Sequence, residues 1–423
     1  MVQIGVLGLG TVGTGVVELI EINNDSIGKR LGELIHVKKI LVKSTDKKRP
    51  QVAEGKLVYQ FEDILNDDDI SIIVELMGGE EPALTYIRQS LSAGKHVVTA
   101  NKELISKHGK ELFNIAAQQN VNLLFEASVG GGIPIIQPLK LSLASNNVNK
   151  IMGILNGTTN YILTQMAEQD KSFADALTEA QAEGFAESDP TADIKGLDAA
   201  RKIAILSSIA FNSRITPELV YTEGIDKVDL VDIKYARELG YIIKLIAVGK
   251  LHEHGIEVAV TPMMLEEDHP LALVKGSFNA ILVEGDAVGR VMFYGQGAGK
   301  MPTASAVVAD IMESVRNSKG SKVYCTCYNK TKILDPGLTS ASFYLRLKVK
   351  DMPGVLSKIS GALGENQISL SKVFQKNTIN GTAEVILITY DVPFRNLNDA
   401  LEEIKAYKQV EEISCVMRVE GED

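Results

Sequence analysis

Residues 2–13 read VQIGVLGLGTVG, and this short stretch decides the fold predicted for the first part of the chain. The apolar run Val2–Leu7 predicts a buried strand, and a helix with apolar periodicity follows the last glycine. In that context G-x-G-x-x-G predicts a dinucleotide-binding turn: Gly8 makes the tight turn, Gly10 lets the backbone approach a pyrophosphate, and Gly13 lets helix and strand pack closely. The alternative is a glycine-rich turn without a ligand. The predicted cofactor contacts are Gly8, Leu9, Gly10, Thr11, Val12 and Gly13.

Residues 1–130 alternate strand and helix signals, which predicts an α/β fold with an open parallel sheet, a Rossmann dinucleotide-binding domain. Ligands of such sheets bind beyond the carboxyl ends of the strands. Lys102 stands at such an end, where its ammonium could contact both cofactor and substrate; a solvent-facing lysine at a helix start is the alternative. The further strands are expected at Val37–Val42, Ile70–Leu76, His96–Thr99 and Val121–Phe125.

The second predicted strand bears on the choice of cofactor. It ends in Lys43, where an Asp or Glu would be expected to bind the ribose 2′-hydroxyl of NAD. Further cations follow, and positive charge suits a 2′-phosphate, so we predict a preference for NADP(H). NAD(H) stays open because Asp46 is close, and a basic surface turn would give the same pattern. The further cations are Lys47, Lys48 and Arg49.

The stretch Ala182–Ala204 gathers carboxylates ahead of a predicted helix, Asp198–Leu206. Asp198 and Lys202 are four residues apart and therefore on one face of that helix, with the acid N-terminal. A surface ion pair is the plainer interpretation. The loop before the helix favours instead a pocket for a small polar substrate with an amine and a reducible carbonyl. The carboxylates of that loop are Glu187, Asp189 and Asp193.

The middle of the chain, residues 131–320, is predicted to form a separate α+β domain. Just before it, the run Val129–Ile133 beside Glu126 offers enough oxygen atoms for a hard cation, although a flexible crossover between domains is the alternative. A glycine-rich segment precedes a helix at about 300–317, which could return to the cofactor. The strands are expected at Ile151–Leu155, Ala247–Leu251, Glu257–Thr261, Phe278–Val283 and Val288–Tyr294.

The last part of the chain, residues 341–423, follows a predicted linker at 318–340 and reads strand, helix, strand, strand, helix, strand. This order predicts a ferredoxin-like split βαβ module. The segment Asp351–Gly354 leaves amides available at a helix N-terminus, which suits a small carboxylate. Because the module carries no obvious catalytic group, we interpret it as a sensor or dimerisation unit.

Composition limits the class of protein. A chain of 423 residues should hold two or three domains, and a net charge of −10 argues against nucleic acid as the main partner. No apolar run reaches the roughly 18 residues of a membrane span. Three cysteines, Cys325, Cys327 and Cys415, fit neither a disulfide framework nor a four-ligand zinc site, and we take the first two as strand residues. We therefore expect a cytoplasmic protein.

Six motifs together resemble the homoserine dehydrogenase family over nearly the whole chain, and the C-terminal module is similar to an ACT regulatory domain. The resemblance implies reversible NAD(P)H-dependent reduction of L-aspartate 4-semialdehyde to L-homoserine, on the route to threonine and methionine. It also implies that residues 131–320 bind substrate and dimerise. The motifs are Gly8–Gly13, Thr99–Lys102, Glu126–Pro134, Gly153–Asn160, Glu187–Lys202 and Gly295–Thr303.

The resemblance also implies roles for single residues. Lys202 would be the proton donor to the carbonyl, and Lys102 its partner between nicotinamide and substrate. Threonine or a related end product would bind the ACT domain, and the protein would be a homodimer or homotetramer. The remaining implied contacts are Gly184, Glu187, Asp193 and Asp198 for the substrate, Gly299 for the cofactor, and Glu126, Val129, Gly131 and Ile133 for a monovalent cation, Na⁺ or K⁺.

Two other classes of protein stay open at this point. One is an amino-acid-responsive binding protein built on an inactive dehydrogenase scaffold, and the other is a different enzyme on the same cofactor fold, such as an amino acid dehydrogenase. Turnover of the semialdehyde with NADPH would discriminate among the three.

Overall fold

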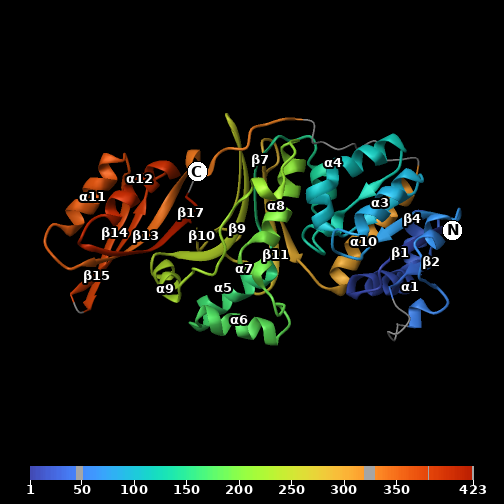
Figure 1. Ribbon diagram of the computed structural model, residues 1–423, viewed down its shortest axis with the longest axis horizontal. Coiled ribbons are helices and arrows are strands. Elements are labelled where there is room, and N and C mark those ends of the chain that lie inside the picture. Colours follow the sequence, from blue (N-terminus) through green and yellow to red (C-terminus); the bar gives the residue numbers. More distant parts are fainter. Residues whose placement is uncertain (44–50, 319–328, 380, 422–423) are drawn as a thin grey trace. The chain divides into compact units, whose positions relative to one another are not determined.

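The computed structural model describes residues 1–43, 51–318, 329–379 and 381–421 (Figure 1). They form two compact units, which we describe separately. The first unit comprises Met1–Gly157, Asp198–Val220 and Phe278–Thr331, and the second comprises Thr158–Leu197, Tyr221–Ser277 and Lys332–Asp423. In the part of the chain that the structure describes, no helix combines the length and the apolar character needed to cross a bilayer. The residues Asp46, Lys47, Lys48, Arg49, Cys325 and Cys327 lie outside the described ranges.

The first unit contains a six-stranded sheet in the order β3-β2-β1-β4-β5-β6, and its neighbouring strands are all parallel. The chain order reverses at β1, which makes the end of β1 the switch point at which such sheets bind ligands. The Rossmann prediction is confirmed, although the last strand is only two residues long. The strands are β1 (Val2–Leu7), β2 (Ile35–Leu41), β3 (Leu57–Val58), β4 (Ile70–Glu75), β5 (His96–Thr99) and β6 (Leu123–Leu124).

Helices cover both faces of this sheet. On one face α1 (Thr11–Leu31) lies beside α10 (Lys300–Arg316), and both share an apolar cluster with β1, β2 and β4. The two helices approach closely at Gly15, where a Cβ atom would lie 2.9 Å from the carbonyl oxygen of Lys300. The opposite face carries a second apolar cluster. The helices that complete the layer are α2 (Glu62–Leu65), α3 (Ala83–Ser92) and α4 (Lys102–Gln118).

Three further strands of the first unit form an antiparallel ladder in the order β12-β11-β7. The same unit holds α8 (Leu197–Ala210), which contains Asp198 and Lys202 and is longer than the sequence predicted. The ladder strands are β7 (Val148–Ile154), β11 (Phe278–Gly285) and β12 (Gly289–Gln296).

The second unit is built on one continuous set of strands, in the order β9-β10-β17-β13-β15-β14. Its central hairpin, β9 (Tyr241–His252) with β10 (Gly255–Glu266), pairs over the full length of both strands. Both hairpin strands are longer than predicted. The other elements outside the C-terminal module are α5 (Gly157–Gln169), α6 (Phe173–Ala182), α7 (Thr191–Ile194), β8 (Tyr221–Thr222) and α9 (Leu230–Glu238).

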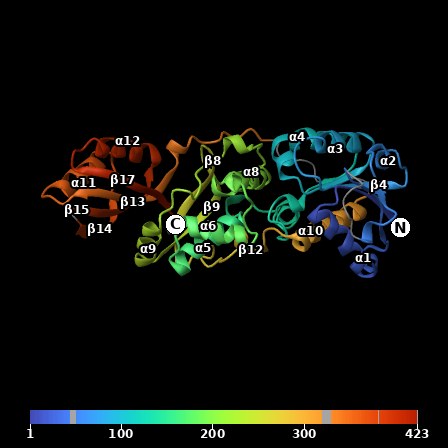
Figure 2. The ribbon, with the colours of Figure 1, turned by 60° about the horizontal axis from the view of Figure 1, so that its bottom comes forward.

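The C-terminal module has the predicted order of strands and helices. Its helices α11 and α12 pack against the same face of its sheet and share one apolar core (Figure 2). The edge strand β17 pairs with β10, so the module continues the sheet of the second unit. The elements are β13 (Ser340–Lys350), α11 (Val355–Glu365), β14 (Leu370–Ile379), β15 (Thr382–Thr389), β16 (Val392–Pro393), α12 (Phe394–Lys405) and β17 (Val410–Val419).

Candidate functional site

The glycine turn between β1 and α1 has the shape that a phosphate-binding turn requires. Gly8 has φ +102°, and a Cβ atom there would lie 2.8 Å from the carbonyl oxygen of Leu76. A Cβ atom on Gly13 would lie 2.3 Å from the carbonyl oxygen of Gly8, so only glycine permits this approach of helix to strand. Gly10 is different: a Cβ atom there meets nothing within 4 Å, and no side chain caps the helix. The open side of the turn therefore faces outward at a helix N-terminus, where anions bind favourably.

A pocket of about 280 Å³ adjoins this turn beyond the ends of β4 and β5. Val12 from the glycine turn and Lys102 from the start of α4 both line it, so the first unit brings these two predicted contacts to one pocket. The rest of the wall comes from the end of β4, the loops that follow β4 and β5, and the first turn of α4. These residues are Glu75, Leu76, Gly78, Gly79, Ala100, Asn101 and Glu103.

Two residues that the sequence analysis did not single out hold the loops around this pocket. Glu75 is fully buried, and its carboxylate accepts hydrogen bonds from the Thr99 hydroxyl at 2.6 Å and from the Met77 amide at 2.8 Å. Burial raises the pKa of Glu75. Asn101 caps α4 and donates to the carbonyl oxygen of Gly79 at 2.8 Å. The sequence feature that could have identified Glu75 is an acidic residue at the end of a largely apolar strand.

Asp198 joins the two predicted catalytic lysines. Its Oδ2 accepts from Lys202 Nζ at 2.6 Å and from Asn156 Nδ2 at 3.0 Å, and its Oδ1 accepts from Lys102 Nζ. Lys202 also donates to the carbonyl oxygen of Leu155 at 2.6 Å. The side chains of Asp198 and Lys202 are only 6% and 10% exposed, which excludes the surface ion pair, whereas that of Lys102 is 38% exposed.

The charges in this cluster keep Asp198 ionised. Burial by itself would raise the pKa of Asp198, but the positive charges of Lys202 and Lys102 hold it well below its ordinary value. A buried carboxylate is tolerated when charged donors satisfy it, as the two ammonium groups and the Asn156 amide do here. Asp198 therefore holds the buried ammonium of Lys202 next to the ammonium of Lys102, which lines the pocket. Asn156 belongs to the polar turn after β7, and nothing in the helix spacing pointed to it.

The remaining predicted cofactor residues lie in the first unit. Lys43 is exposed just after β2. Gly299 is the residue before α10 and has φ +126°, a conformation that favours glycine. The segment after β6 and the segment before α10 approach through their backbones, because a Cβ atom on Gly131 would lie 2.4 Å from the carbonyl oxygen of Gly297.

In the segment predicted to bind a cation, the carboxylate of Glu126 already accepts hydrogen bonds from nearby backbone amides. Glu126 is buried, with Oε1 accepting from the amides of Ile135 at 2.6 Å and Ile136 at 2.7 Å, and Oε2 accepting from the amide of Gln137 at 2.7 Å. Burial raises the pKa of Glu126, and these amides oppose the shift. Beside it, burial and the charge of Glu126 raise the pKa of Asp310 to about 8. What the segment can offer a cation is thus its backbone carbonyl oxygens.

The other predicted substrate contacts belong to the second unit, whereas Asp198 and the lysines belong to the first. Gly184 follows α6 with φ +79°, and its amide donates to the carbonyl oxygen of Gln181 at 3.2 Å. Glu187 is exposed, and Asp193 is half-buried in α7.

Comparisons with known proteins agree on one family. Residues 8–126 match the family model described as homoserine dehydrogenase, NAD binding domain, residues 134–312 match homoserine dehydrogenase, and residues 343–409 match the ACT domain. The chain is 44% identical to a homoserine dehydrogenase of Synechocystis sp., with 99% of each chain covered. It is therefore similar to a curated member over its whole length.

Solved structures give the same result. A homoserine dehydrogenase from Thiobacillus denitrificans matches with a TM-score of 0.94 and 41% identity, covering 99% of this chain and 98% of the other. A mutant hyperthermophilic archaeal homoserine dehydrogenase in complex with NADPH matches with a TM-score of 0.64 and 29% identity, covering 74% of this chain and 98% of the other. The 44% identity over 99% of each chain, together with the fold shared over nearly the whole chain with the Thiobacillus denitrificans structure, shows that this chain, with its dinucleotide turn and buried lysine–carboxylate cluster, belongs to the homoserine dehydrogenase family.

Proposed function

We propose that this chain reduces the aldehyde of L-aspartate 4-semialdehyde to L-homoserine, and oxidises homoserine in reverse, with Lys202 as the proton donor. The observation that carries the proposal is the Asp198 carboxylate, which holds the buried ammonium of Lys202 beside that of Lys102 at the cofactor turn's pocket. Membership of the family indicates the reaction, and the cluster of Lys102, Asp198 and Lys202 contains the charged groups that this reaction needs. A cytoplasmic homodimer or homotetramer remains our expectation.

The bound nicotinamide would supply the hydride that reduces the aldehyde carbon. As negative charge develops on the carbonyl oxygen, an ammonium within hydrogen-bond reach stabilises it and donates the proton. We assign this step to Lys202 and the positioning of the substrate to Lys102. Asp198 already accepts hydrogen bonds from both lysines, so we assign it the task of orienting them, in addition to the substrate contact that the sequence suggested.

We propose that acidic residues of the second unit recognise the amine of the substrate. We assign this role to Glu187 and Asp193, with the Gly184 backbone as a further contact. A carboxylate opposite an ammonium group gives selectivity over aldehydes that lack the amine, because the acid would otherwise be left unpaired.

The test of the proposed reaction is NADPH oxidation that depends on the semialdehyde. We expect steady turnover with this substrate and little with an aldehyde that lacks the amine, such as butanal. Protein that binds NADPH without turning over the semialdehyde would overturn the assignment and favour an inactive scaffold.

The preference for NADP(H) rests on the exposed Lys43 at the end of β2. We expect Lys43→Glu to shift the ratio of kcat/KM for NADPH over NADH by about tenfold or more toward NADH, since a carboxylate repels the 2′-phosphate and can bind the ribose hydroxyl. The ratio is measured with both cofactors at fixed semialdehyde concentration. Lys29→Glu, a charge reversal at an exposed lysine near the far end of α1, is the control that should leave the ratio unchanged. An unchanged ratio in Lys43→Glu would remove this residue from cofactor discrimination.

A monovalent cation, Na⁺ or K⁺, fits the segment around Glu126. Its donors would be the backbone carbonyl oxygens of Glu126, Val129, Gly131 and Ile133, because the Glu126 carboxylate is already held by three amides. Neutral oxygen ligands suit a hard cation of low charge. Such a cation would stiffen the segment that approaches Gly297.

The ACT domain indicates regulation by an amino acid, and we propose threonine or a related end product as the effector. The supporting feature is the start of α11, where Gly354 has φ +85° and no side chain caps the helix. Backbone amides there can hold a carboxylate.

We expect threonine to inhibit the full-length protein, with a coupling free energy of about 1–3 kcal/mol. Gly354→Asp should abolish this inhibition while leaving the uninhibited kcat unchanged, because the new carboxylate occupies the helix amides and repels the ligand. The matched control is Gly354→Ala, which introduces the same strain at φ +85° without a carboxylate and should leave the inhibition in place. Inhibition that persists in Gly354→Asp would show that the effector does not bind at the start of α11. Deleting residues 341–423 is a poorer test, because it removes β17 from β10.

A further inference from the structure

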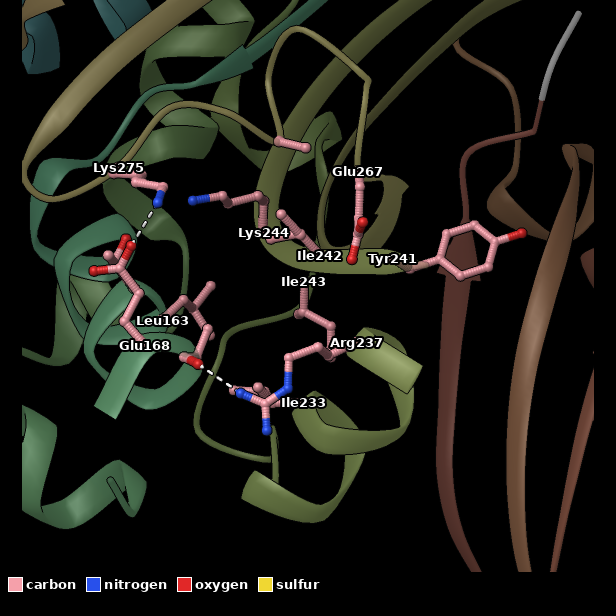
Figure 3. Close-up of a pocket in the computed structure, with 13 residues that line it drawn as sticks. Leu163, Glu168, Ile233, Arg237, Tyr241, Ile242, Ile243, Lys244, Glu267 and Lys275 are labelled. Carbon is pink, nitrogen blue, oxygen red and sulfur yellow. Dashed lines mark hydrogen bonds and ion pairs between the residues drawn. The ribbon is translucent and has the colours of Figure 1, made fainter. Parts of the chain in front are cut away.

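A second pocket of about 160 Å³ lies wholly within the second unit, between α5, α9 and β9 (Figure 3). None of its residues belongs to the site described above. Its floor is apolar and is made by the buried side chains of Leu163, Ile233 and Ile243. Charged groups occupy its walls, among them Lys244 and Lys275. An apolar floor with a few converging charges is the usual composition of a small-molecule site.

Lys244 is the unusual group in this wall. The residue is only 3% exposed, and its ammonium donates to Asn160 Oδ1 at 2.9 Å and to the carbonyl oxygen of Val274 at 2.6 Å. Both acceptors are neutral. Within the described ranges no carboxylate lies at ion-pair distance from this ammonium, although a buried charge is normally paired with an opposite one. A lysine ammonium has three donors, so one remains for a ligand.

The surroundings of Lys244 carry a surplus positive charge. Lys275 Nζ pairs with Glu168 Oε1 at 2.7 Å, and Figure 3 shows the end of Lys244 directed toward the side of the pocket on which this pair lies. Two ammonium groups and one carboxylate leave one net positive charge there. Burial lowers the pKa of Lys244 to about 8; the charge of Glu168 opposes this shift and that of Lys275 reinforces it.

We propose that this pocket binds a small organic monocarboxylate with a short aliphatic body. The carboxylate would accept from Lys244 and Lys275, and the aliphatic part would pack on Leu163, Ile233 and Ile243. The single surplus charge matches a monoanion, and the small apolar floor favours a short hydrocarbon chain over a sugar phosphate or a nucleotide. The other charged groups of the wall are Arg237, which donates to the carbonyl oxygen of Ala167 at 3.2 Å, and Glu267.

Ligand binding can be measured locally at α9, because this helix lines the pocket. Ile233 and Arg237 of this helix line the pocket, while Asp232 of the same helix is buried and pairs with Arg346 Nε of β13 at 2.6 Å. Tyr241, at the start of β9, also lines the pocket. The ammonium of Lys372 lies over its ring, 4.8 Å from the ring centroid. A ligand that fills the pocket would therefore restrain a helix that the C-terminal module also contacts. Slower amide hydrogen exchange in α9 and the start of β9 is the expected consequence.

The experiment uses the full chain with sodium pentanoate as the probe, at pH 7 and constant ionic strength. Pentanoate should slow amide exchange across residues 230–245 and leave α3 unaffected, whereas the neutral isostere pentanamide should have no effect. Lys244→Met should weaken pentanoate binding by about tenfold or more, the loss expected for a charged hydrogen bond. Lys234→Met, an exposed lysine on α9, is the matched control that should bind normally.

A second variant keeps the proposal testable if Lys244→Met folds poorly. Lys275 has a largely exposed side chain, so Lys275→Met should fold and still bind pentanoate more weakly. Binding should also weaken as the pH rises past about 8, when the Lys244 ammonium loses its proton. Equal protection by pentanoate and pentanamide, or pentanoate protection that survives both variants, would overturn the proposal. Semialdehyde turnover by the same preparations tests the proposed reaction separately.

Discussion

Replacing Lys202 by alanine is expected to lower kcat by about 10²–10⁴-fold, the range for the loss of a proton donor, with folding intact. The fold should survive because Asp198 would keep two of its donors, Lys102 and Asn156, after the change. The measurement is semialdehyde turnover under saturating NADPH, together with a thermal unfolding curve. A loss of kcat without a collapse of Tm would assign the effect to chemistry.

The control for Lys202 is another lysine of the same motif. Lys195 forms a partly exposed ion pair with Asp226 at 2.8 Å, and Lys195→Ala should leave kcat within about twofold of the wild type, since exposed pairs contribute little. If Lys202→Ala turned over substrate as fast as Lys195→Ala, the ammonium of Lys202 would be a structural group and the proposed proton transfer would be wrong.

Removing Asp198 should have the largest effect on stability. Asp198→Ala leaves the Lys202 ammonium buried with the Leu155 carbonyl oxygen but without its carboxylate, and it leaves two lysines that repel each other. Breaking a buried pair in this way costs about 3–5 kcal/mol of unfolding free energy. We expect a loss of that size in chemical denaturation and a fall in kcat similar to that of Lys202→Ala. Asp226→Asn, which breaks the partly exposed pair with Lys195, should cost less than about 1 kcal/mol.

The pH dependence gives an independent check on Asp198. Its folded pKa lies below the unfolded value, so its contribution to stability is complete above about pH 4 and is lost as the pH falls through the folded pKa. The difference in unfolding free energy between wild type and Asp198→Asn should therefore be constant near neutral pH and shrink only in acid. A difference that grew toward low pH would show that this carboxylate is not stabilised by the lysines.

Local sequence patterns determined much of the fold. The run Val2–Leu7 followed by the glycine turn predicted β1 and α1, and the order of elements after residue 341 predicted the C-terminal module. The start of β9 and the end of β10 were missed because nearly every residue in those two stretches is buried. Without an alternation of buried and exposed residues, the pattern does not mark where such a strand begins or ends.

In the candidate site, too, some features follow from local sequence and others only from tertiary packing. Helix periodicity alone placed Asp198 and Lys202 on one face, because residues four apart are neighbours on any α-helix. The third group, Lys102, is 96 residues away in the chain, and its contact with Asp198 exists only because α4 and α8 are brought together in the first unit. The burial that turns a common surface pair into a cluster of fixed charges has the same origin. Local spacing thus determined which side chains could pair, whereas packing between distant elements decided which of them are buried, since burial depends on everything that surrounds a helix.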